Sequence, residues 1–124
     1  MKPWSSSTRI LLAMVAAAAL SLQALPVGAT VSSQSKIARV MILEGDVGIV
    51  ELEATATQAS CSNPQYSSDG RQWTFLVSTA HGKAILNALL TAHVTRANVV
   101  IVGTGACSIG LAREDVSQAH VFSP

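Results

Sequence analysis

Beyond an apolar N-terminal stretch, hydrophobic and polar positions follow the two-residue period of β-strands. Residues 36–43 are rich in strand formers, and in residues 47–57 apolar side chains alternate with Glu51 and Glu53. Because a strand points successive side chains to opposite faces, this pattern predicts a hairpin with one face in water. A run of turn formers follows, and residues 73–77 then predict a third strand.

Residues 78–96 change to the period of an amphipathic helix. Ser78 or Thr79 can cap its N-terminus, and Arg96 lies near its C-terminus, where a positive charge complements the helix dipole. The predicted polar face consists of Lys83, Asn87, Thr91 and Thr95, and the predicted apolar face of Ile85, Leu86, Leu89 and Ala92. We therefore expect this helix to pack on a sheet.

Two further strands are predicted after the helix. Residues 98–103 are almost entirely apolar, which indicates a strand buried on both faces, and residues 116–122 alternate weakly. The resulting order is β-β-β-α-β-β. It predicts a mostly β fold with one helix.

The first 29 residues (1–29) have the pattern of a signal peptide. A basic start without acids precedes an unbroken apolar run over residues 10–20, and small residues follow at 27–29. The run is shorter than the roughly 20 apolar residues of a membrane-spanning helix. We expect cleavage after Ala29, which leaves residues 30–124 (124 − 29 = 95 residues) as one secreted or periplasmic domain without a membrane span. An uncleaved anchor helix is the alternative.

The charge of the expected mature chain is nearly balanced. Without Lys2 and Arg9 it has 8 − 2 = 6 basic residues against 7 acidic ones. Nucleic-acid binders of this size usually have a clustered basic face, whereas these basic residues are scattered along the sequence. We therefore expect no nucleic-acid partner.

Cys61 and Cys107 are the only cysteines. In an oxidising compartment, two thiols in one small domain most simply form a disulfide. The alternative is a reactive thiol at Cys107, which requires a neighbouring base or a helix N-terminus. The next residues, Ser108 to Gly110, supply neither.

The stretch VVIVGTGACSIG, residues 99–110, has the glycines of a phosphate-binding loop. Such a loop presents backbone N–H groups and the N-terminus of a following helix to the anion. Here a weak strand follows, and the third glycine of G-x-G-x-x-G and the Gly-Lys pair of a P-loop are missing. We therefore expect these glycines to let a buried strand turn tightly, which brings Cys107 to Cys61.

The hairpin, the cysteine before a Trp-x-Phe strand, the helix GKAILNALLTAH and the strand VVIVGTGAC together resemble the B subunits of AB5 bacterial toxins (enterotoxin B-like) and their small secreted relatives. The resemblance covers about residues 37–122. It implies a five-stranded, OB-like, partly open barrel capped by one α-helix. In the toxins this domain is similar to a lectin, assembles as a pentamer and recognises cell-surface glycans without catalysis.

No residue pattern indicates catalysis, a metal or a cofactor. His81, His93 and His120 lack the spacing of zinc ligands. His93 lies on the apolar side of the helix, where a satisfied interfacial histidine is expected and a pH-sensitive or pore-lining group is the alternative. Glu51 and Glu53 are expected to solvate one strand face rather than to act as a catalytic pair.

Tyr66 is the candidate ligand-binding residue. Its loop also contains short hydrogen-bonding side chains: Asn63, Gln65, Ser67, Ser68 and Asp69. An aromatic ring among such groups suits a carbohydrate, and loops on a rigid barrel commonly carry binding sites. Trp73, by contrast, is expected to anchor the core.

These patterns predict a non-catalytic binding protein with a glycan partner. A small extracytoplasmic enzyme inhibitor or accessory protein is the alternative, and a minor hydrolase is a third possibility. The first strand has a single charge, Arg39, over residues 38–43, so its edge can pair with another copy in a ring, with the polar helix face lining a channel. A monomer whose edge is covered by residues 30–35 is the other expectation.

Overall fold

The computed structural model describes residues 28–124, so the predicted leader lies outside the described residues except for its last two positions. The elements follow the predicted order: β1 (Ile37–Leu43), β2 (Val47–Leu52), β3 (Gln72–Leu76), α2 (Ala80–Thr95), β4 (Val99–Gly103) and β5 (Val116–Val121). The expected mostly β fold with one helix and one disulfide is confirmed for residues 28–124.

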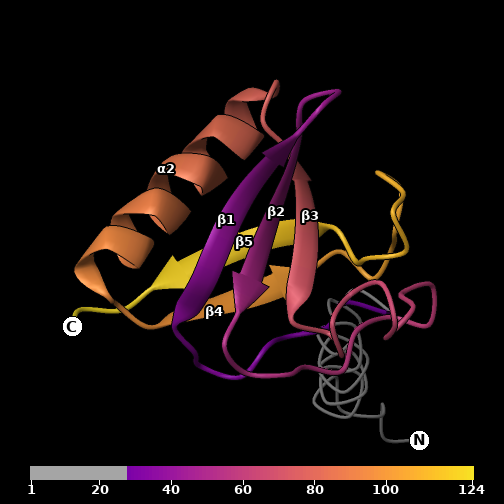
Figure 1. The fold of residues 1–124 in the computed structure, drawn as a ribbon, viewed down its shortest axis with the longest axis horizontal. Coiled ribbons are helices and arrows are strands. Elements are labelled where there is room, and N and C mark those ends of the chain that lie inside the picture. Colours follow the sequence, from indigo (N-terminus) through magenta and orange to yellow (C-terminus); the bar gives the residue numbers. More distant parts are fainter. Residues whose placement is uncertain (1–27) are drawn as a thin grey trace, which may run out of the picture.

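The strands form two sheets that are not closed into a barrel. β1, β2 and β3 form an antiparallel sheet in that order, and β4 pairs antiparallel with β5. Single bridges lie on both sides: Val31 to Val102 and Ser35 to Val99 join the segment before β1 to β4, and Thr74 of β3 is joined to Asp115, just before β5. This arrangement fits the expected partly open barrel. Figure 1 shows the two sheets crossing, with α2 beside β1.

Helix α2 begins and ends as its sequence predicts. Thr79 is the N-cap, and its side-chain oxygen accepts a hydrogen bond from the Gly82 N–H at 2.9 Å. Arg96 ends the helix in the left-handed conformation, at φ 58°. The predicted apolar face is buried or half-buried against the sheets, and the predicted polar face is exposed.

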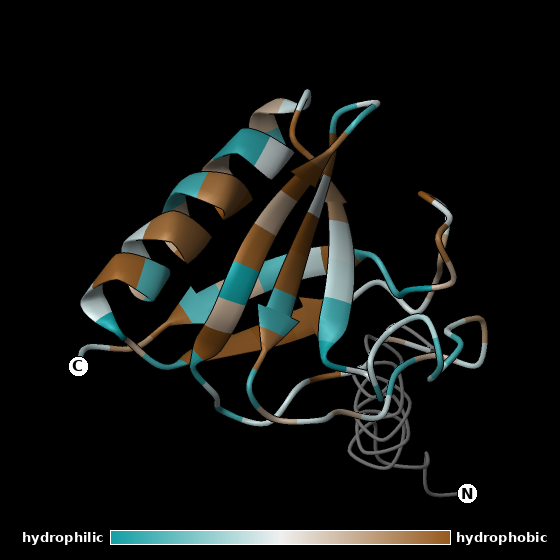
Figure 2. Cartoon of the chain, viewed as in Figure 1, coloured by the Kyte–Doolittle hydropathy of each residue, from teal (hydrophilic) through white to brown (hydrophobic). Residues whose placement is uncertain are grey.

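The core lies between α2 and the two sheets. Trp73 is fully buried there with Val50, Leu89 and Ile101, which confirms its predicted role. Figure 2 shows the apolar residues concentrated on the strands, whereas the loops on the side away from α2 are mostly polar. The strands and the helix therefore form a rigid support for those loops.

The predicted solvent-exposed face of the hairpin holds only in part: Arg39 and Leu43 on β1 and Glu53 after β2 are exposed, but the β2 half of that face is buried. β2 is the middle strand, and Ile49 and Glu51 are buried although they lie on the face opposite Val50 and Leu52. Ile49 pairs with Thr74, and the loop between β4 and β5 reaches this face through Asp115, which accepts a hydrogen bond from the Thr74 hydroxyl at 2.9 Å. A loop distant in sequence therefore reaches part of the face that the alternation alone assigns to solvent.

Candidate binding site on the disulfide-linked loops

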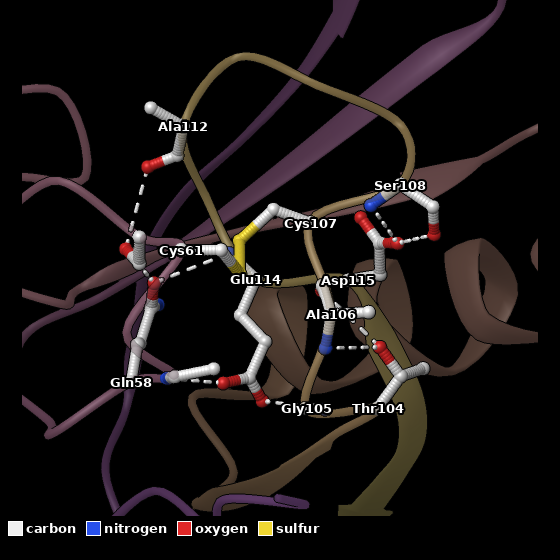
Figure 3. Close-up of a disulfide and its surroundings, with 12 residues drawn as sticks. Gln58, Cys61, Thr104, Gly105, Ala106, Cys107, Ser108, Ala112, Glu114 and Asp115 are labelled. Carbon is white, nitrogen blue, oxygen red and sulfur yellow. Dashed lines mark hydrogen bonds between the residues drawn. A yellow bond between two sulfur atoms is a disulfide. The ribbon is translucent and has the colours of Figure 1, made fainter.

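Two loops on the side of the molecule away from α2 are joined by the Cys61–Cys107 disulfide (Figures 1 and 3). Residues 53–71 form the first loop and residues 104–115 the second. The Cα atoms of the cysteines are 6.0 Å apart, and neither cysteine is free. The predicted pairing is confirmed, and the alternative of a reactive thiol at Cys107 is wrong.

The glycine-rich stretch presents its backbone to a carboxylate of the same chain. Asp115 accepts hydrogen bonds from the Ser108 N–H at 2.8 Å and from the Ile109 N–H at 3.3 Å, and also from the Ser108 hydroxyl (Figure 3). A phosphate loop would direct such N–H groups at a bound anion. Here Asp115 occupies that position and fixes the second loop against β3.

Tyr66 lines a hollow between the two loops, together with Leu111, Ala112 and Arg113. The hollow has a volume of about 310 Å³, and Tyr66 is 57% exposed. The Asn63 N–H donates to the Ala112 carbonyl at 2.9 Å, which connects the first loop to the second beside the disulfide. We call this feature the Tyr66 hollow.

An unusual turn forms the wall of this hollow opposite Tyr66. Leu111 and Ala112 both have positive φ, at 64° and 50°, a conformation that costs roughly 1 kcal/mol or more for each such residue. Arg113 supports the turn, because its Nη1 donates to the Leu111 carbonyl at 2.7 Å. Leu111 is thereby held with its side chain partly in solvent.

The polar neighbours expected around Tyr66 do not line its hollow. The Asn63 side chain accepts from the Gln65 N–H at 3.0 Å, and Ser67 is buried and accepts from the Gly70 N–H. Asp69 lines a different hollow of about 340 Å³, next to residues 56–59. These side chains shape the first loop, and the residues that line the hollow with Tyr66 come instead from the second loop.

Three arginines gather on the outer face of the three-stranded sheet. Arg39 Nε lies 2.6 Å from Glu51 Oε2, and Arg71 Nη2 lies 3.4 Å from Glu51 Oε1. Gln72 donates to Glu51 at 3.1 Å and accepts from Arg113 Nε at 2.8 Å. We call Arg39, Arg71 and Arg113 the arginine cluster. The six basic residues are therefore not all scattered: the fold collects half of them around one carboxylate.

The charges of this group affect one another. Burial alone raises the pKa of the Glu51 carboxyl, but hydrogen bonds from Arg39 and Gln72, with the charges of Arg39 and Arg71, hold it below its ordinary value of 4.5. Burial lowers the pKa of the Arg113 guanidinium, and the Glu51 charge opposes this change. Glu51 is ionised at neutral pH, and its expected role as a solvated surface acid is wrong.

The histidines lie apart and have separate partners. The His93 ring is half-buried and lies 3.2 Å from the Ile37 carbonyl, as expected for a satisfied interfacial histidine. The His81 ring contacts the Ser117 carbonyl at 2.8 Å, and the His120 ring contacts Gln118. Within residues 28–124, no three His, Cys, Asp or Glu side chains gather as metal ligands, and no helix could cross a membrane.

The sequence indicated Tyr66 as a candidate, which the structure places in the lining of a hollow, but not Leu111, Ala112 and Arg113, which line it too. A signal was present, because Leu111 lies just after a glycine and just before the charged run Arg113 to Asp115, where a buried position is not expected. Comparisons with family models, curated proteins and solved structures give no match for this chain. The resemblance to toxin B subunits stays a prediction.

Proposed function

We propose that this protein is a secreted or periplasmic binding protein without catalytic activity, and that it recognises an acidic glycan at the Tyr66 hollow. The observation that carries the proposal is an exposed aromatic ring beside an arginine, in a hollow between two loops that a disulfide links. A sugar ring can lie against the tyrosine face. Loops on OB-like barrels are known positions for oligosaccharide sites.

The arginine cluster favours an acidic ligand over a neutral one. It brings three positive charges together against the single negative charge of Glu51, a local balance of 3 − 1 = +2. Arg113 belongs both to the cluster and to the lining of the hollow. Guanidinium groups bind carboxylate and sulfate oxygens in a planar, directional way, so the ligand's acidic group would lie at this end.

Replacement of Tyr66 should separate stacking from hydrogen bonding. In a glycan array with matched acidic and neutral glycans, we expect Tyr66→Ala to lose at least tenfold in affinity, about 1.4 kcal/mol, because it removes the ring. Tyr66→Phe keeps the ring and should bind within a few-fold of the natural protein. Arg113→Ala should reduce binding of acidic glycans more than of neutral ones.

Selective glycan binding that Tyr66→Ala leaves unchanged would contradict this assignment.

A specific observation also favours the alternative of an enzyme inhibitor: Leu111 is 46% exposed on a loop held by Asp115, Arg113 and the disulfide, as a docking side chain would be. That function would be supported instead if the protein bound no glycan on the array but captured an enzyme, and if Leu111→Ala abolished this capture.

We propose further that the chain forms a homo-oligomer, with a pentameric ring as the form that the resemblance implies. β1 is an edge strand with Ile42 and Leu43 exposed, and on α2 Leu90 and Val94 are exposed one turn apart, Val94 to 82%. Pairing of edges and burial of such residues between copies would remove both features from water.

Light scattering on residues 30–124 at micromolar concentration tests the assembly. We expect a mass several times that of one chain, and we expect Val94→Glu to reduce it, because the charge would be buried at the contact. Lys83→Glu, a charge change on the neighbouring polar face, is the matched control and should leave a contact through Leu90 and Val94 in place. A mass of one chain would overturn the ring and the multivalent binding that depends on it.

A further inference from the structure

Glu114 is a fully buried carboxylate whose described partners are all neutral. It is 0% exposed, and its oxygens accept from the Thr30 hydroxyl at 2.7 Å, the Ala59 N–H at 2.5 Å and the Gly105 N–H at 3.4 Å. Figure 3 shows its carboxylate pointing away from Asp115, toward Gly105. The salt bridges found within residues 28–124 involve Glu51 and Glu53 and not Glu114. A buried carboxylate is costly without a cation.

Thr30 is held beside this carboxylate by its own backbone. The Gly103 N–H donates to the Thr30 carbonyl at 2.8 Å, and the Ser32 N–H donates to the Ile101 carbonyl at 2.8 Å. The segment therefore runs along β4 with a fixed register. The nitrogen of Thr30 is separated by three bonds from the hydroxyl that binds Glu114, so it lies within about 6 Å of the carboxylate.

The residues just before Thr30 pack closely on the same place. A Cβ atom on Gly105 would lie 2.5 Å from both the carbonyl carbon and the oxygen of Gly28, so this contact requires glycine. The sequence predicts cleavage between Ala29 and Thr30. Cleavage there would remove the Gly28–Ala29 peptide from Gly105 and leave a protonated amino group on Thr30.

We propose that Glu114 receives the α-ammonium group of Thr30 after cleavage, so that processing at Ala29 supplies the missing cation and stabilises the fold. An opposite charge within about 6 Å favours an ionised carboxylate. The pair would join the N-terminus to the second loop, because Glu114 lies between Arg113 and Asp115. This inference rests on the predicted cleavage site and is independent of the ligand.

Thermal unfolding of two forms of residues 30–124 tests the pair. One form has a free amino group on Thr30, and the other carries an acetyl group there, which removes the charge but keeps the hydroxyl. We expect the free form to melt about 5–10 °C higher, because acetylation leaves Glu114 without its cation. Fluorescence of Trp73 can follow unfolding, since the other of the two tryptophans is Trp4 in the predicted leader.

The same comparison of free and acetylated forms in the variant Glu114→Gln completes a double-mutant cycle. In this variant, acetylation should change the melting temperature by no more than about 1–2 °C, because the negative charge is gone. Equal melting of the two natural-sequence forms would overturn the proposal, as would an equal loss in Glu114→Gln. If Glu114→Gln does not fold, acetylated and free forms of Glu53→Gln show whether the difference comes instead from the loss of a distant exposed carboxylate. In Glu53→Gln we expect the full difference in melting temperature to remain.

An exported chain whose intact mass shows that it begins at a residue other than Thr30 would overturn the proposed cleavage step.

Discussion

Loss of the Cys61–Cys107 disulfide should reduce the free energy of unfolding by about 4 kcal/mol. The cysteines are 46 residues apart, and cross-linking a loop of this length restricts the unfolded chain by about that amount. The total free energy of unfolding of a domain of this size is only about 5–15 kcal/mol. We expect the double variant Cys61→Ser, Cys107→Ser to show this loss in urea unfolding. Binding at the Tyr66 hollow should weaken as well, because both loops contribute to its lining.

A reductant provides the matched control. Reduction of the natural protein should move its urea midpoint to that of the double variant, and the double variant itself should not respond to the reductant. The interactions of Asp115 with Ser108 and Thr74 remain in both, so part of the second loop should stay ordered. A double variant within about 1 kcal/mol of the natural protein would show that the unfolded chain is already restricted near these residues.

The sequence predicts the elements well because their signals are local. The N-cap at Thr79 and the period of the helix both lie within a few residues of the features that they determine. The disulfide follows from composition and the expected compartment, since two cysteines leave one intramolecular pairing. These expectations needed no knowledge of how distant segments pack.

The candidate site was predictable only in part, because it depends on packing between distant segments. Arg39 lies opposite Glu51 because the hairpin turns at residues 44–46, and this part of the site depends on local pairing. The approach of Arg113 to Gln72 depends on how the end of the second loop lies beside β3, and no local pattern specifies this. Glu51 is buried against Arg39 of β1 and against Arg71 and Gln72 at the start of β3, so the error in its predicted exposure and the missed arginine cluster both come from contacts between distant segments.

Glu51→Gln should lower stability and raise affinity for acidic glycans. At neutral pH the variant loses the ionic hydrogen bond from Arg39, which we expect to cost about 1–2 kcal/mol of unfolding free energy. The local charge balance would rise from 3 − 1 = +2 to +3. We therefore expect acidic glycans to bind a few-fold more tightly, with a gain that disappears at high salt, whereas neutral glycans should be unaffected.

The stability difference should depend on pH in one direction. The pKa of Glu51 in the folded protein lies below its ordinary value of 4.5. Its stabilising contribution is therefore complete above about pH 4.5, the unfolded value, and is lost as the pH falls through the lower folded pKa. Urea unfolding at a series of pH values from neutral to acid should show the natural protein and Glu51→Gln converging at the acid end.

Glu53→Gln is the matched control, because it removes the same charge two residues along the chain. Glu53 pairs with Arg96 at 2.9 Å, and both side chains are about half exposed, so we expect less than about 0.5 kcal/mol of lost stability. Its affinity for acidic glycans should not change, since Arg96 is outside the arginine cluster. If Glu51→Gln lowered both stability and acidic-glycan affinity, the cluster would be a structural support for the second loop, and the acidic group of the ligand would have to bind elsewhere.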